Sequence, residues 1–145
     1  MQTMIDKPGV KLARGVCRML SEMDYGTLTE FPTRSGHRMD VCAIGPKGQI
    51  WCIEVKSSKA DFQSDTKWHH YLEWCDRLYF AVPEGFPEEL LPLEHGLIRA
   101  DEWGAEIIRD TMDEALPAAR RKAITLRYAR LASERLIRAL AAPTR

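Results

Sequence analysis

The sequence DVCAI occupies residues 40–44, and the sequence IWCIEVK occupies residues 50–56. Both are short apolar runs with β-branched or aromatic residues, a composition typical of buried β-strands. Side chains alternate between the two faces of a strand, so Glu54 and Lys56 project from the same face at the end of the second run. Charges in that place cost free energy unless they are paired or bind a ligand.

A hairpin between the two runs would bring a second acid to the same place. Gly45-Pro46-Lys47-Gly48 separates the runs and has the composition of a tight connection. If the strands pair across it, Asp40 faces Glu54. Two carboxylates so close repel each other, and a divalent cation relieves the repulsion. The spacing therefore predicts a metal site at Asp40 and Glu54, with Lys56 beside it to orient or deprotonate water or to stabilise a phosphoryl transition state.

The remaining pattern predicts a mixed sheet with helices. Extended segments are expected at 27–31, 37–45, 49–58, 78–83, 95–101 and 103–110, and helical segments at 10–23, 61–75 (one long or two short helices), 87–92 and 120–141. A helix between two apolar strands predicts that strands 49–58 and 78–83 are parallel, with a right-handed crossover. The short turns before residue 49 predict antiparallel pairing.

Size and composition limit the class of protein. A chain of 145 residues with 45% apolar and 29% charged residues fits one soluble domain with a hydrophobic core. The sequence contains no run of about eighteen apolar residues, and its first fifteen residues lack a signal-peptide core. We therefore expect a cytoplasmic protein with no membrane span. The four cysteines form no CxxC pair, which predicts reduced, mostly buried thiols rather than a zinc site.

Charge is distributed unevenly along the chain. Residues 117–145 contain eight Lys or Arg and one acid, Glu134, although the whole chain has a net charge of zero. One interpretation is that this basic segment contacts nucleic acid, with Arg120, Arg121 and Lys122 as the candidate contacts. The other is that a solvated basic face packs against an acidic body. The sequence leaves both open.

Two levels of family resemblance follow from these residues. Residues 38–68 resemble the PD-(D/E)XK nuclease superfamily, whose metal site combines an Asp with a later Glu-x-Lys. The segments GHRMDV, EVKSSKADFQSD, KWHHYLEWCDRLYFAVP and GLIRAD are more closely similar to the MmcB-like DNA repair family. This second resemblance extends from about Arg14 to Arg130.

The resemblance implies a fold. It is a restriction-endonuclease-like three-layer α/β/α sandwich around a central mixed sheet, with the order helix, three antiparallel strands, helix and parallel strand. A C-terminal helix follows. On this interpretation residues 1–145 form a single nuclease-like domain in which 117–145 is the basic helical segment.

The resemblance also implies roles for individual residues. Asp40 and Glu54 would hold Mg²⁺ or Mn²⁺ together with the backbone carbonyl of Val55, and Lys56 would be the catalytic lysine. Many members supply a further acid from the first helix. Glu22 on that helix and Glu30 on the first strand are the two candidates, and the sequence does not decide between them.

The function implied is hydrolysis of DNA phosphodiesters in repair, on damaged or structured DNA. Ser57 and Lys67 follow the Glu-x-Lys triplet and have donors suited to phosphate. Trp68 either stacks on a base or packs on the sheet with Tyr71. The alternative function is a non-catalytic DNA-binding protein or repair-complex scaffold, because an acidic body repels DNA unless a basic helix or a partner compensates. The sequence shows no dedicated interface motif, so a homodimer and repair-complex partners both stay open.

Overall fold

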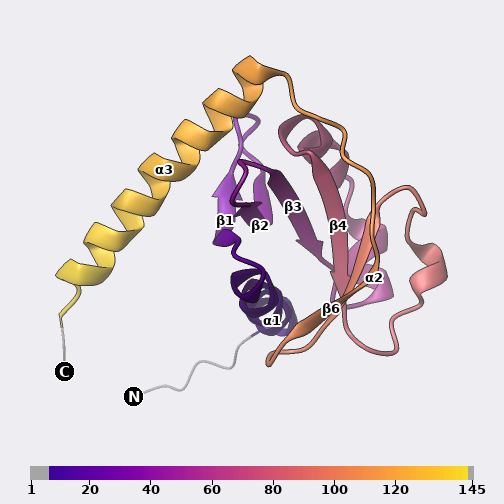
Figure 1. The fold of residues 1–145 in the computed structure, drawn as a ribbon. Coiled ribbons are helices and arrows are strands. Elements are labelled where there is room, and N and C mark those ends of the chain that lie inside the picture. The colour runs from indigo at the N-terminus through magenta and orange to yellow at the C-terminus, as the bar shows by residue number, and fades with distance from the viewer. Residues whose placement is uncertain (1–6, 144–145) are drawn as a thin grey trace.

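The computed structural model of the protein describes residues 7–143. Within them, six strands form one sheet in the spatial order β1 to β6 (Figure 1). The elements in chain order are α1 (Pro8–Glu22), β1 (Gly26–Pro32), β2 (Arg38–Ile44), β3 (Ile50–Val55), α2 (Lys59–Ser64), the 3₁₀ helix η1 (Trp68–Trp74), β4 (Arg77–Val82), the 3₁₀ turn η2 (Glu88–Leu90), β5 (Gly96–Ala100), β6 (Ala105–Arg109) and α3 (Ala118–Ala141).

The sheet is mixed, which confirms the α/β class. β1, β2 and β3 are antiparallel neighbours, β3, β4 and β5 run parallel, and β6 is antiparallel to β5. The predicted parallel pairing of the third and fourth strands is therefore confirmed. The parallel pairing of β4 with β5 was not predicted, because the pattern of residues 95–110 shows a strand pair but not which neighbour the pair joins.

The β2–β3 hairpin has the register that places Asp40 next to Glu54. Val41 faces Ile53 and Cys42 faces Cys52, so one step further along the ladder the two acids face each other. Every residue of β3 is buried, as expected for an interior strand covered on both faces. The strand ends at Val55, three residues earlier than the sequence predicts.

Helix α1 covers one face of the sheet (Figure 1). Its residues Leu12, Val16 and Leu20 pack in one cluster with the side chains of Trp51, Ile53 and their neighbours. The fit is close at Gly15, because a Cβ there would lie 1.8 Å from the carbonyl oxygen of Asp101. Glycine thus lets α1 approach the turn between β5 and β6, and the helix N-terminus comes to lie near the ends of β2 and β3.

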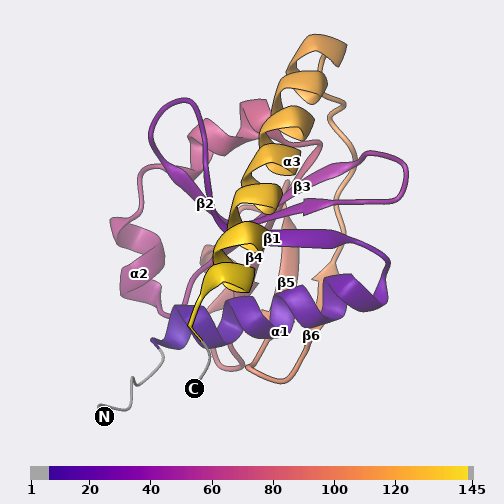
Figure 2. The same cartoon turned by 90° about the vertical axis from the view of Figure 1, so that its left-hand side faces the viewer.

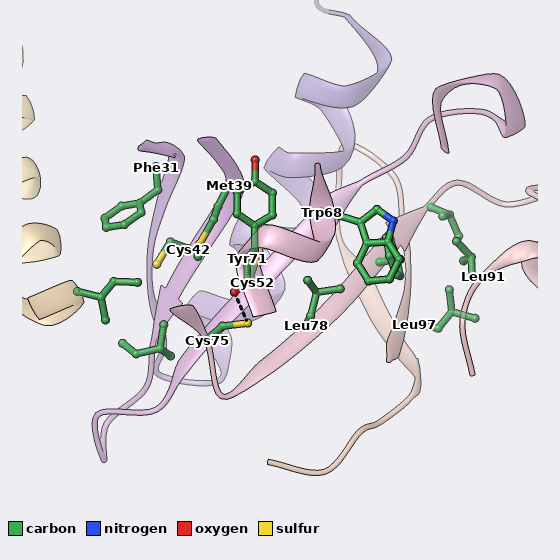
Figure 3. Packing of buried hydrophobic residues seen from close by; sticks show 14 of the residues in the cluster. Phe31, Met39, Cys42, Cys52, Trp68, Tyr71, Cys75, Leu78, Leu91 and Leu97 are labelled. Atoms are coloured by element: carbon green, nitrogen blue, oxygen red, sulfur yellow. Dashed lines mark hydrogen bonds between the residues drawn. The ribbon is translucent and has the colours of Figure 1, made fainter. Parts of the chain in front are cut away.

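The other face carries η1, α2 and the first half of α3 (Figure 3). Trp68 and Tyr71 of η1 are 7% and 3% exposed and belong to this core, so the interpretation that they pack on the sheet is confirmed. Cys42, Cys52 and Cys75 lie in the same cluster, and all four cysteines are free, as predicted.

The expected helical region 61–75 is broken into two short elements. Ser58 caps α2 by accepting a hydrogen bond from the Asp61 N–H at 3.1 Å. The helix then stops at Asp65, whose backbone is extended and whose side chain accepts a hydrogen bond from the Lys67 N–H at 2.7 Å. The second element is a 3₁₀ helix rather than an α-helix.

Helix α3 covers the free edge of β1 (Figure 2). Its Arg135 donates to the carbonyls of Thr29 and Glu30, at 2.6 and 3.0 Å, and Arg127 donates to that of Pro32. These guanidinium groups satisfy carbonyls that an edge strand would otherwise leave unpaired. Of the basic segment, Arg145 lies outside the described residues. No helix among residues 7–143 is long and apolar enough to cross a membrane.

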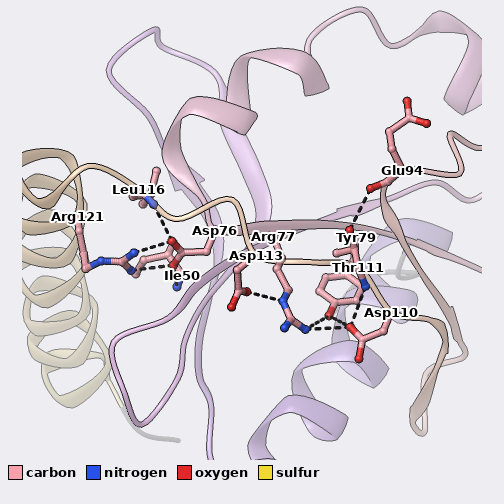
Figure 4. A network of polar contacts seen from close by, with 10 residues as sticks. All are labelled: Ile50, Asp76, Arg77, Tyr79, Glu94, Asp110, Thr111, Asp113, Leu116 and Arg121. Carbon is pink, nitrogen blue, oxygen red and sulfur yellow. Dashed lines mark hydrogen bonds and ion pairs between the residues drawn. The ribbon is translucent and has the colours of Figure 1, made fainter.

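Asp76 ties α3 to the sheet (Figure 4). Its carboxylate is 5% exposed and pairs with Arg121 at 2.6 Å, and it accepts the N–H groups of Ile50 and Leu116 at 2.8 and 2.9 Å. Burial alone would raise the pKa of Asp76, but these hydrogen bonds outweigh it and lower the pKa. Arg120 likewise donates to the Glu73 carbonyl. The packed-face interpretation of the basic segment thus holds for these arginines.

Replacing Asp76 should loosen the whole C-terminal segment. We expect Asp76→Ala to lower the free energy of unfolding by about 3 kcal/mol, because it leaves Arg121 and two buried N–H groups without their partner. Asp113→Ala, which removes an exposed ion pair to Arg77, should cost about 1 kcal/mol or less. Urea denaturation of both variants checks the difference, and equal losses would contradict the role assigned to Asp76.

Candidate active site

A pocket of about 1120 Å³ lies where the ends of β2 and β3 meet the first turns of α1. Strand β1 and the segment after β3 complete its walls. The predicted site residues that line it are Glu30, Asp40, Glu54, Val55, Lys56, Ser57 and Lys67. The structure therefore brings the predicted catalytic trio and most of the proposed phosphate contacts to one cavity.

Asp40 and Glu54 are joined through the backbone of their strands. The Asp40 N–H donates to Glu54 Oε2 at 3.0 Å, and the Val55 N–H donates to Asp40 Oδ2 at 2.8 Å. Each carboxylate is thereby held in place through one oxygen. Among residues 7–143, no hydrogen bond engages Asp40 Oδ1 or Glu54 Oε1. Two fixed carboxylates, each with an oxygen left over in a pocket, fit the donor set of Mg²⁺ or Mn²⁺.

The electrostatics of the pair support the same interpretation. Burial raises the pKa of Asp40 from 3.8 to about 6, against the lowering effects of the Val55 N–H and of Lys56. Burial and then the charge of Asp40 raise the pKa of Glu54 well above 4.5. Since each carboxylate makes ionisation of the other harder, a nearby cation would stabilise both in the charged form.

Lys56 is also buried, at 4% exposed, and its ammonium group forms an ion pair with Asp65. The backbone of Lys56 is held in the sheet, since its N–H donates to the Ala81 carbonyl at 2.9 Å. For Asp65, burial alone would raise the pKa, but the hydrogen bonds from Lys56 and from the Lys67 N–H lower it. The pair explains why α2 ends where it does, because Asp65 is drawn into the pocket.

The two candidates for a further acid lie in different places. Glu22 is the exposed last residue of α1, at the end remote from the pocket that the first turns line. Glu30 lies in the pocket wall with a positive φ of 49°. Its neighbours Thr29 and Phe31 pair with Val41 and Met39, so Glu30 stands opposite Asp40. Three adjacent strands thus each carry an acid at this level, but the ladder skips Glu30 at its positive φ, so strand alternation does not fix where its side chain points.

These three acids do not by themselves form a complete metal site. Among residues 7–143, no group of three or more His, Cys, Asp or Glu side chains is arranged to hold a metal ion. Glu30 influences Asp40 electrostatically, since its charge contributes to the raised pKa of Asp40. The third ligand, including the Val55 carbonyl, therefore stays a prediction.

Sequence reasoning missed several residues of the pocket. Asp65 is the partner of Lys56, a contact that no sequence pattern indicates. Lys7 and Arg38 line the pocket and are exposed, but they are distant from the Glu-x-Lys triplet in the sequence, so only tertiary packing reveals them. Ser57 lies in the pocket with its N–H and hydroxyl bonded to Asp61.

The three basic candidates on α3 do not line this pocket. Arg121 pairs with Asp76, and Arg120 donates to a backbone carbonyl and lies over the Trp74 ring, 5.5 Å from its centroid. Lys122 is exposed. That these residues contact nucleic acid stays a prediction, and for Arg120 and Arg121 such contact would compete with contacts inside the protein.

Comparison with known proteins places these features in a family. The sequence profile of the family described as "DNA repair protein MmcB-like" matches residues 3–143. A solved structure, described as the SPO1766 protein of unknown function from Silicibacter pomeroyi, is 49% identical. The match covers 95% of this chain and 94% of that one, with a TM-score of 0.91. No curated protein matches the sequence.

The raised pKa values have a consequence for stability. Below the ordinary Glu pKa, folded and unfolded chains both hold the proton of Glu54. As the pH rises, the unfolded chain ionises first, so the wild-type protein loses stability up to the raised pKa. Glu54→Gln keeps a hydrogen-bond acceptor for the Asp40 N–H. Because glutamine does not ionise, the stability of the variant does not fall in this way as the pH rises.

Without added metal, we therefore expect Glu54→Gln to equal the wild type in free energy of unfolding at pH 4. At pH 8 it should exceed the wild type, because the variant does not bear the cost of ionising a buried carboxyl group. Denaturation at the two pH values measures this, with Glu22→Gln as the exposed control that changes neither. If Glu54→Gln were less stable than the wild type at pH 8, the charge of Glu54 would not destabilise the folded protein.

Proposed function

Because the chain belongs to the MmcB-like DNA repair protein family, we propose that it is a metal-dependent nuclease that cleaves DNA during repair. The family implies a role in DNA repair. The convergence of Asp40 and Glu54 in the pocket, each with an oxygen free of hydrogen bonds to the described residues, is the observation that supports hydrolysis most strongly. We also propose that the chain belongs to the PD-(D/E)XK superfamily. Its mixed sheet, with α1 on one face and η1 on the other, supports this.

Asp40 and Glu54 are the residues that would hold Mg²⁺ or Mn²⁺, with the Val55 carbonyl and Glu30 as further candidates. When bound, such a cation would neutralise the two carboxylates and polarise a phosphoryl oxygen of the substrate. The protein's own part is geometric. Backbone N–H groups orient both carboxylates. The pocket also limits the solvent that would screen their attraction for a cation.

Lys56 would supply positive charge next to the scissile phosphate. Its ammonium group is buried and forms an ion pair with the Asp65 carboxylate. This arrangement supports a role in stabilising charge that develops on the phosphoryl oxygens more than a role in removing a proton from water. Asp65 would then position Lys56 when no substrate is present.

The rim of the pocket supports an anionic polymer as the substrate. Lys7, Arg38 and Lys67 are exposed where they border it, and Ser57 adds a hydroxyl. Such groups contact phosphates without reading sequence. This fits a repair enzyme that acts on damaged or structured DNA, and the choice of DNA over RNA rests on the family.

A non-catalytic DNA-binding scaffold is the second candidate, and one observation favours it. The ammonium group of Lys56 is already paired with Asp65. Among the described residues, no third side chain is placed to complete a metal site. If the pocket only binds DNA, affinity for DNA should survive Glu54→Ala and fall when the Lys7, Arg38 and Lys67 charges are removed together.

Cleavage assays separate the two candidates. Purified protein should cut at least one of nicked, branched or single-stranded DNA in Mg²⁺ or Mn²⁺, and Lys56→Ala and Asp40→Asn should each reduce the rate by about 100-fold or more. Lys47→Ala, an exposed lysine in the turn at the far end of the hairpin, is the matched control and should keep full activity. Absence of cleavage, or cleavage that survives both site variants, would exclude catalysis at this pocket.

Metal binding can be measured without any substrate. We expect millimolar Mn²⁺ or Mg²⁺ to raise the thermal midpoint of the wild-type protein by several degrees, since a ligand that binds only the folded state stabilises it. Asp40→Asn and Glu54→Gln should lose this shift, while Asp113→Asn should retain it. A shift that persists in both site variants would place the metal elsewhere.

A further inference from the structure

Helix α3 has two apolar faces, of which one is used within the chain. Ile124, Tyr128 and Leu131 face the sheet and pack against its core. On the opposite side, Leu126, Leu136, Ile137 and Leu140 are 58–73% exposed. No other element of residues 7–143 lies over this side (Figure 1). A helix of 24 residues therefore presents an uncovered apolar stripe to solvent.

The spacing of this stripe is that of a helix-pairing seam. Leu126, Ala129, Ser133, Leu136 and Leu140 recur at intervals of three and four residues, and all are exposed. A seam with this repeat packs side by side with a second helix. The small side chains of Ala129 and Ser133 lie at its centre, where they would let two backbones approach closely. The leucines lie toward its two ends.

We propose that this stripe, defined by Leu126, Ala129, Ser133, Leu136, Ile137 and Leu140, is a homodimer interface in which two α3 helices pack antiparallel about Ser133. In that register Leu126 of one copy meets Leu140 of the other, on both sides of the two-fold axis. Parallel packing would instead bring Lys122 against Lys122 and Arg130 against Arg130, within a segment already rich in positive charge.

The exposed surface is sufficient for such a contact. Four side chains at 58–73% exposure offer roughly 500 Å² of apolar surface per chain, so a pair would bury about 1,000 Å², near the lower limit of specific interfaces. A self-complementary patch is what a two-fold dimer requires.

The charges on α3 favour this occupant over nucleic acid or lipid. Arg120, Arg121, Arg127 and Arg135 donate to groups of the same chain. The other cations of the helix are Lys122, Arg130 and Arg138, all exposed, and helical spacing places Lys122 and Arg130 nearest the stripe. Phosphate groups would find few donors there. The dimer does not rest on the proposed function, although Arg135 contacts Glu30 of the pocket wall and α3 therefore lies next to the pocket in each copy.

Oligomeric state is the first test. Sedimentation equilibrium of the full chain should give a dimer at micromolar concentration, and Leu136→Glu with Ile137→Glu should give a folded monomer. Met112→Glu replaces an apolar residue that is 86% exposed and lies outside α3, and it should leave the dimer intact. A monomeric wild type would overturn the proposal, as would a dimer that survives the double substitution. Circular dichroism confirms that the variants fold.

Crosslinking tests the register. Under mild oxidation Ser133→Cys should form an intermolecular disulfide, because the residue meets its own copy at the two-fold axis. Lys122→Cys should not, since it meets its own copy only in a parallel pair. Crosslinking of Lys122→Cys would overturn the antiparallel arrangement, and failure of Ser133→Cys to exceed the wild-type background would overturn the interface.

Discussion

One buried and one half-buried carboxylate, those of Glu54 and Asp40, lie at the end of one hairpin and impose the constraint on which the rest of the site depends. Asp40 and Glu54 occupy facing positions beyond the last pairs of the β2–β3 ladder, and each accepts a backbone N–H that holds it in place. Removing such groups from water costs several kcal/mol when they are ionised. Burial therefore raises their pKa values, so that the groups stay protonated to higher pH. A divalent cation would offset most of the cost of the ionised form.

The surrounding structure maintains that arrangement. Gly15 lets α1 approach the sheet closely, and its first turns then form one wall of the pocket. Asp65 breaks the helical segment after β3 and compensates the charge of Lys56. Asp76, just before β4, fixes the first turn of α3 to the sheet, and α3 in turn covers β1, the strand that carries Glu30. These contacts fix α1, the segment after β3 and β1, which are the elements that border the site.

The sequence predicts the parts of this arrangement that depend on local periodicity. Alternation along residues 50–56 and the tight turn at 45–48 were sufficient to place Asp40 opposite Glu54, and the long helix near 120–141 was recognisable from its composition. What the sequence does not show are contacts between distant segments. The partner of Lys56, the basic residues Lys7 and Arg38 at the pocket, and the parallel pairing of β4 with β5 follow from tertiary packing. The basic segment was ambiguous for the same reason, because its arginines bind backbone carbonyls that no sequence pattern identifies.

A crystal structure of the protein soaked in Mn²⁺ would test the central claim most directly. Anomalous density between the Asp40 and Glu54 carboxylates, within ligand distance of both and with Lys56 nearby, is the result expected if the two acids form a metal site. An empty position between them at saturating Mn²⁺, with both carboxylates in the places they occupy without metal, would contradict it.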